Sequence, residues 1–323
     1  IKSTKRAASV VMAMIVAIIS TQIFASIFDI DLSSSSYFKS NINYFAIIIG
    51  GALFGAGMMI ADGCSSRSIV KFSQGDANAL VTLLFIAIFA FASTKGILFG
   101  VVNGFINNQF MIDISSNLSN FTLNIYFVLV ILVLILAYFV KKVKRVFSLY
   151  DGVIIGFLIG FAWFISGYIG AESIEKEIQV QALSYVFPSA KTLEFFTFFE
   201  ITELSIGVCI VLGAIFGAYF STFFNKKYSF GCTSKMNFNK LKYNMIGGSM
   251  MGIGGIMAIG CTVGQGLSGV STLVFSSFLA IISIGVSGFI TGKILYKKDK
   301  LPMCFLFEWE DDDKKQKPLD YEI

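Results

Sequence analysis

Residues 50–65 read GGALFGAGMMIADGCS, and residues 247–262 read GGSMMGIGGIMAIGCT. In both runs a Gly-Gly pair precedes a Gly-Cys pair by the same offset, from Gly50 to Gly63 and from Gly247 to Gly260. Repeats of this kind, with small residues inside apolar segments, are typical of carriers built from two related halves. The pattern predicts a two-fold membrane protein with a cysteine near its centre.

Composition sets the class. The chain is 55% hydrophobic and 14% charged, with a mean hydropathy of +0.77, so it is not an ordinary soluble domain. Apolar stretches long enough to cross a bilayer recur along it. We therefore expect an all-α, polytopic integral membrane protein. The expected stretches are Ala7–Phe28, Tyr44–Ala61, Asn78–Val101, Leu123–Val140, Gly152–Ile169, Leu204–Phe223, Met245–Gly260 and Leu267–Leu295, of which the second and seventh are glycine-rich and short or broken.

The distribution of basic residues predicts the orientation. Lysine and arginine gather before the first stretch and after the fourth, sixth and eighth: Lys2, Lys5, Arg6; Lys141, Lys142, Lys144, Arg145; Lys226, Lys227, Lys235, Lys240, Lys242; Lys293, Lys297, Lys298, Lys300. The connections Asp29–Asn43, Asn103–Thr122 and Ala171–Glu203 are polar or acidic instead. The positive-inside rule then gives eight crossings with both ends cytoplasmic. The net charge of +5 needs no nucleic-acid partner.

Two halves are expected. Residues 1–146 form a first membrane repeat, residues 147–307 a second, and residues 308–323 a polar cytoplasmic tail. The second half has an additional Gly-Cys-Thr before its repeated run, whereas the first half has only one apolar stretch there. Because the chain also starts at Ile1 rather than methionine, we expect an N-terminal piece to precede it.

The glycines permit two interpretations. Small residues at four-residue spacing let membrane helices pack closely, as Gly51 with Gly55 and Gly248 with Gly252 would do. Alternatively, the helix breaks at the glycines, and the exposed N–H groups of a half-helix bind an anion. The polar strings after the cysteines, residues 65–68 and 262–269, favour broken helices that line a cavity.

The cysteines supply the candidate chemistry. The chain has five and lacks both histidine and a Cys-x-x-Cys pair, which excludes the usual zinc sites and a Cys–His dyad. Cys64 and Cys261 occupy matching positions of the repeat, although two small packing residues kept from a duplication would look the same. Cys232 echoes Cys261 within its Gly-Cys-Thr. Cys209 is expected to be a packing residue and Cys304 incidental.

These motifs carry a resemblance. Residues 248–273, with the core AIGCTVGQGLSGVSTL, and residues 59–75, through GCSSRSIV, resemble the signatures of the YeeE/YedE sulfur transporter family. Phe187-Pro188-Ser189-Ala190 resembles a connecting segment of that family. The resemblance implies an inner-membrane permease of two pseudo-symmetric halves, whose characterised members take up thiosulfate. It also implies that pathway cysteines relay the ion through S–H contacts. Two of these correspond to Cys64 and Cys261, and a third belongs to a hairpin before Ile1.

The predicted substrate pathway combines the cysteines with nearby donors: Cys64, Cys261, Cys232, Ser65, Ser66, Arg67, Thr262, Gln265, Gly63 and Gly260. A neutral thiol is a weak donor and a polarizable acceptor, which suits a soft anion that must also be released. Asp62 departs from the family, where a small residue is expected. Its carboxylate would repel an anion unless it is protonated, pairs with Arg67 or Lys71, or points away.

We therefore predict a transporter that relays a sulfur-containing anion, most simply thiosulfate, and neither an enzyme nor a cofactor protein. A family transporter of a selenium compound or another sulfur oxyanion is the first alternative, because the Cys-x-x-Arg pattern of Cys64–Arg67 resembles members tied to selenium metabolism. A membrane sulfur-relay or redox protein is the second. The expected partners are the anion, the lipid bilayer and a soluble cytoplasmic sulfur-carrier protein.

Overall fold

The computed structural model describes residues 4–38, 43–106, 124–142, 149–170, 180–198, 205–224 and 238–298. Its regular elements there are helices, as predicted: α1 (Thr4–Ile27), α2 (Tyr44–Ile60), α3 (Ser65–Ser73), α4 (Ala77–Thr94), α5 (Phe99–Ile106), α6 (Ile125–Lys142), α7 (Tyr150–Phe164), α8 (Val186–Phe198), α9 (Ile206–Phe224), α10 (Phe238–Met257) and α11 (Phe275–Lys297). Short 3₁₀ turns at Leu32–Ser34 and Ser36–Phe38 and π-helical turns at Ile165–Ile169 and Gly264–Gly269 complete the described fold.

Six described segments are long and apolar enough to cross a membrane, which confirms the polytopic class. They are Ala7–Ile27, Tyr44–Ser73, Ala77–Thr94, Tyr150–Ile169, Ile206–Phe224 and Phe275–Lys297. Two predicted stretches were too long. The third ends at Thr94 and is followed by the separate short helix α5, and the eighth is interrupted before α11. That interruption has a backbone cause, because Leu273 adopts a left-handed φ of 62° and Val274 is extended.

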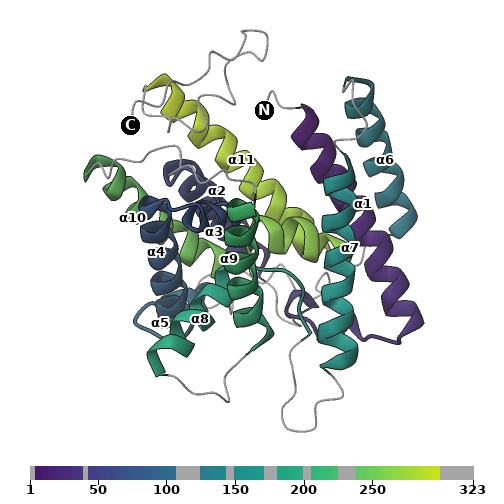
Figure 1. The fold of residues 1–323 in the computed structure, drawn as a ribbon, viewed down its shortest axis with the longest axis horizontal. Helices are drawn as coiled ribbons and strands as arrows, with labels where there is room; N and C mark the ends of the chain where they lie inside the picture. Colours follow the sequence, from purple (N-terminus) through teal and green to yellow (C-terminus); the bar gives the residue numbers. More distant parts are fainter. Residues whose placement is uncertain are drawn as a thin grey trace.

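The helices form two groups (Figure 1). In the first, α7 runs parallel to α1, and α6 packs on the other side of α1. Glycines of α7 meet the α1 backbone directly, and the Ser20 hydroxyl donates to the Gly156 carbonyl at 3.1 Å. The second group contains α2, α3, α4, α8, α9 and α10, with α11 beside α2. In Figure 1, α1 begins and α11 ends on the same side of the molecule.

Glycines hold the second group together. Gly51 and Gly55 of α2 face residues 280–288 of α11, whereas Gly248 and Gly252 of α10 face residues 82–90 of α4. Each half therefore contributes one helix that packs on the glycine face of the other half: α11 covers α2, and α4 covers α10. The glycines of the two faces occupy matching positions of the repeat. Between these pairs, α2 and α10 run antiparallel with their backbones in contact. The close-packing interpretation of the glycines is correct for these helices.

We predict that Gly252→Ala destabilises the protein. A Cβ there would lie 2.7 Å from the Ile86 carbonyl oxygen, so α4 and α10 must separate, at a cost of about 1–3 kcal/mol. Thermal unfolding in detergent measures the effect. Gly213→Ala on α9 is the matched control, because no atom lies within 4 Å of its added Cβ. Equal unfolding temperatures for the two variants would contradict this account of the interface.

Candidate functional site

Both Gly-Cys elements are helix breaks with the same backbone geometry. Asp62 and Ile259 take left-handed φ values of 61° and 57°, and the glycines after them have φ values of 153° and 159°. The Gly63 N–H donates to the Met58 carbonyl at 3.0 Å, and the Gly260 N–H donates to the Gly255 carbonyl at 2.8 Å. This is the 6→1 hydrogen bond of a Schellman motif, in which Asp62 or Ile259 is the left-handed residue and the glycine after it is the donor. The structure thus contains the predicted broken helices.

A new helical turn starts directly at each cysteine. The Cys64 carbonyl accepts the Ser68 N–H at 2.9 Å, and the Cys261 carbonyl accepts the Gln265 N–H at 2.7 Å. The first N–H groups of a helix have no partner within the helix, and the positive end of the helix dipole lies there. At the second break, the Gly264 N–H donates to the Cys261 sulfur at 3.3 Å. At the first, the Cys64 sulfur lies 3.2 Å from the Ser66 hydroxyl oxygen.

The residue after each cysteine carries a hydroxyl without a partner. Ser65 is fully buried, and its Oγ has no hydrogen bond within the described part of the chain. The same is true of Thr262 Oγ1, at the matching position of the repeat. Buried polar groups are nearly always hydrogen-bonded, so an unpaired one points to a missing ligand or water. Two such hydroxyls, one at each helix start, form a matched pair of candidate ligand donors.

Two other predicted residues have structural contacts. The Gln265 side-chain N–H donates to the Ala258 carbonyl at 2.6 Å and so closes the second break, while its amide oxygen has no partner among the described residues. The aliphatic stem of Arg67 lies against Gly63, at 3.1–3.5 Å from where a Cβ would stand. Both side chains therefore fill the breaks.

The two thiols pack against one buried cluster. Cys261 is 0% exposed and belongs to it together with Ala61, whereas the half-buried Cys64 packs against its edge. Tyr185, from the connection before α8, also packs there. Burial, together with the neighbouring sulfurs of Cys261 and Cys64, raises the pKa of the Tyr185 phenol to about 12. Tyr185 and both thiols thus lie at the same cluster.

Sequence reasoning missed Tyr185. The only signal near it was the Phe187-Pro188-Ser189-Ala190 resemblance, which begins two residues later. The stretch 180–185 is not helical, and side chains of the second break hold it in place. The Ser268 hydroxyl donates to the Leu183 carbonyl at 2.8 Å, for example.

A cavity of about 190 Å³ adjoins the second break. Its walls come from the start of α2, the end of α4, the start of α8, the end of α10 and the stretch before α8. They include Tyr37, Asn43, Thr94, Gln181, Ser184, Phe187, Pro188, Met257, Ile259 and Gly260. Gly260 is the one predicted site residue among the lining residues. That both thiols reach one common cavity stays a prediction.

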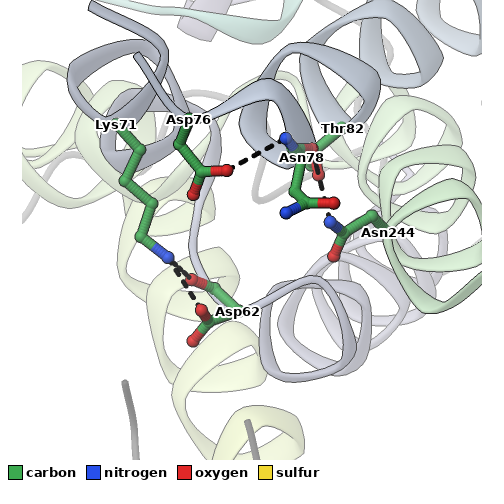
Figure 2. A network of polar contacts seen from close by, with 6 residues as sticks. All are labelled: Asp62, Lys71, Asp76, Asn78, Thr82 and Asn244. Carbon is green, nitrogen blue, oxygen red and sulfur yellow. Dashed lines mark hydrogen bonds and ion pairs between the residues drawn. The ribbon is translucent and has the colours of Figure 1, made fainter. Parts of the chain in front are cut away.

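Asp62 is paired with Lys71. The ammonium lies 2.8 Å from Asp62 Oδ2 and also donates to the Asp62 backbone carbonyl at 2.8 Å (Figure 2). Of the alternatives that the sequence left open, the pairing with Lys71 is thus the one found. Lys71 thus neutralises the Asp62 carboxylate, which lies two residues before the candidate pathway thiol of Cys64.

Two other cysteine expectations have different outcomes. Cys232 lies outside the described residues, so its predicted place in the pathway stays a prediction. Cys209 was expected to pack inside the protein, but it is exposed on α9. The expectation was wrong because an aliphatic span has a lipid-facing side as well as a packed one, and its composition does not distinguish the two.

A profile of the family described as "Sulphur transport" matches residues 1–290. The chain belongs to this family. Among its relatives is the thiosulfate transporter TsuA of Escherichia coli K12, 20% identical over 73% of this chain and 70% of the relative. Another is the thiosulfate transporter TsuA of Spirochaeta thermophila, 25% identical over 80% of this chain and 79% of the relative. Both matches extend across most of the sulphur transport fold described above.

We predict an order of thiol accessibility at the two breaks. In detergent, a small water-soluble alkylating reagent should label the half-buried Cys64 faster than the fully buried Cys261. Mass spectrometry of peptides from timed samples resolves the two sites. Labelling of Cys261 as fast as Cys64 would show that the second break is open to solvent, against the geometry found.

Proposed function

We propose that this protein takes thiosulfate into the cell by way of Cys261 and Cys64. The observation that supports the proposal best is the matched pair of breaks, each with a thiol and an unpartnered hydroxyl at a helix start. The names of the relatives supply the substrate. The ion would leave the cavity beside Gly260, meet Cys261, pass Tyr185 and reach Cys64.

The chemistry of the two breaks suits this anion. Thiosulfate has a polarizable terminal sulfur, for which a neutral thiol is a matched contact, and charged oxygens, for which hydroxyl and backbone N–H groups are donors. Along the proposed route, Ser65 Oγ and Thr262 Oγ1 can donate without giving up any bond among the described residues. None of these donors is charged, which keeps binding weak enough for release.

The predicted orientation indicates which side of the membrane the cavity faces. The cavity is lined by residues 36, 37 and 43 and by residues 181, 182, 184, 187 and 188, which belong to the connections poor in lysine and arginine. By the positive-inside rule, these connections are extracytoplasmic in an inner-membrane protein, so the cavity would be the outer mouth of the pathway. A soluble sulfur-carrier protein on the cytoplasmic side remains part of the prediction.

Substitution of the thiols tests the relay. In uptake assays with labelled thiosulfate, we expect Cys64→Ala to abolish uptake and Cys64→Ser to impair it strongly, because serine keeps a donor but loses the polarizable sulfur. Cys261→Ala should lower uptake less, since the Thr262 hydroxyl offers a donor nearby. Cys209→Ala, at an exposed position of α9, is the matched control and should transport normally.

The same assay with sulfate and selenite separates the alternatives. A relay that uses sulfur contacts should favour thiosulfate over sulfate. Full uptake by Cys64→Ser, together with transport of sulfate, would contradict any special role of the thiol. Preferential uptake of selenite would instead assign the pathway to the selenium alternative suggested by Cys64–Arg67, and conversion of the substrate with consumption of an electron donor would indicate a redox protein.

Tyr185→Phe tests whether the Tyr185 hydroxyl, near the two thiols, donates a hydrogen bond to the passing ion. Loss of one hydrogen bond to a charged ligand costs about 1.5 kcal/mol or more, so uptake at low substrate concentration should fall about tenfold. Tyr168→Phe, at an exposed position near the end of α7, is the control. Equal uptake by the two variants would remove Tyr185 from the pathway.

A further inference from the structure

A polar network occupies the end of the molecule opposite the cavity. The cavity is lined by Thr94 and Met257, the last residues of α4 and α10. The network contains Asn78 and Asn244, which lie near the starts of the same two helices, and the Asn244 side-chain N–H donates to the Asn78 carbonyl at 3.3 Å. Because α4 has 18 residues, its two ends lie about 27 Å apart. The network therefore stands beyond the thiols as seen from the cavity.

The ion pair of Asp62 with Lys71 belongs to this network (Figure 2). Both hydrogen bonds found for the Lys71 ammonium go to Asp62, although an ammonium has three donors. On the other partner, Asp62 Oδ1 is buried and has no bond within the described residues. The side chains are 12% and 21% exposed, so neither is locked away from a ligand. The pair thus has one donor and one acceptor that the contacts found leave open.

Lys71 follows the thiol along one face of α3. Cys64 caps this helix, and Arg67 and Lys71 come three and seven residues later, a spacing that places all three on one side. The Lys71 side chain reaches back toward the start of the helix, as its bond to the Asp62 carbonyl requires. An anion leaving Cys64 along this face would meet the ammonium.

The second helix break has the same backbone geometry as the first but no charged pair at the matching position. Ile259 occupies the position of Asp62 with nearly the same φ, yet it is apolar. There the neutral Gln265 side-chain N–H donates at 2.6 Å to the carbonyl of Ala258, the residue before Ile259, so the two breaks bond carbonyls that are one position apart in the repeat. The backbone geometry of the first break therefore does not require the charges of Lys71 and Asp62, which indicates that these charges have another role.

We propose that Lys71 is an anion site on the far side of Cys64 and that Asp62 is its built-in competitor. The proposal rests on the transport function proposed above. The arriving anion takes over N–H groups that Lys71 now gives to Asp62 Oδ2, in charge-assisted hydrogen bonds. The Asp62 carboxylate and the transported ion then share the Lys71 ammonium. Repulsion between these two anions shortens the time for which the ion stays bound.

Asp76 strengthens the repulsion. It is buried, its N–H donates to the Lys71 carbonyl at 3.0 Å, and its carboxylate accepts the Asn78 N–H at 2.9 Å (Figure 2). Lys71 thus binds the anion briefly, and the two carboxylates favour its release. A site that binds weakly is what conduction requires. A charged binding step then lies at the end of the pathway that the orientation predicts to be cytoplasmic.

The Asp62→Asn variant distinguishes a carboxylate that competes with the anion from a side chain that only stabilises the break. Asparagine has nearly the same shape, adopts the left-handed conformation readily, and keeps the backbone carbonyl that Lys71 binds. With the competitor gone, the anion should be held longer. In proteoliposomes we expect the KM for thiosulfate to fall about tenfold and the maximal uptake rate to fall as well. Thiosulfate should also protect Cys64 from alkylation at correspondingly lower concentrations.

Lys71→Met removes the proposed site and keeps the stem of the side chain. Its KM for thiosulfate should rise about tenfold, and adding Lys71→Met to Asp62→Asn should cancel the gain in apparent affinity. Lys298→Met, at the end of α11, changes the net charge equally and should leave KM unchanged. Thermal unfolding of each variant shows whether it is folded.

The outcomes distinguish this proposal from the one it rests on. Absence of thiosulfate uptake by the unsubstituted protein would overturn the proposed function. Normal uptake by that protein, with an unchanged KM in Asp62→Asn, would overturn the role of the ion pair alone. An equal loss of stability and maximal rate in Asp62→Asn and Lys71→Met, with KM unchanged in both, would assign the pair a purely structural role and likewise overturn the proposal.

Discussion

A helix that ends inside a membrane protein leaves backbone N–H and carbonyl groups without partners, and the surrounding hydrocarbon offers none. The rest of the second helix group is arranged around this constraint. At both breaks, a glycine closes the last turn through its own N–H, and a side chain from the following helix bonds a carbonyl near the break. Lys71 bonds the Asp62 carbonyl in the first half, and Gln265 bonds the Ala258 carbonyl, one repeat position earlier, in the second. Each break thus has its own side-chain partner for a carbonyl near the end of the helix.

The groups that remain unsatisfied define the site. The Asp62 and Ala258 carbonyls at the breaks find side-chain partners, whereas the hydroxyls after the two cysteines find none among the described residues. A protein that only needed to be stable would place alanine at such positions, since an unpaired buried hydroxyl is costly. The two hydroxyls are potential donors at both helix starts, which suits an anion, and they occupy matching positions of the repeat.

The sequence was sufficient for the elements whose signal is local. The Gly-Cys repeat predicted both breaks and the symmetry of Cys64 with Cys261, because a left-handed turn after a small-residue run depends on neighbouring residues only. Tyr185 and the cavity could not be predicted, since the stretch before α8 has no periodic pattern and is placed by tertiary contacts such as the one between Ser268 and Leu183. The partner of Asp62 was narrowed to two cations by sequence proximity, but only three-dimensional geometry selects Lys71.

The exchange of helices between the halves also has a consequence for how the protein is made. The glycine face of α2 is covered by α10 and α11, which follow it in the chain by roughly two hundred residues. At about 5–20 residues per second, a ribosome needs roughly ten to forty seconds to synthesise that length. During this time α2 is complete while its helical neighbours do not yet exist. Lipid, or a helper protein in the membrane, must cover the bare backbone until the second half arrives.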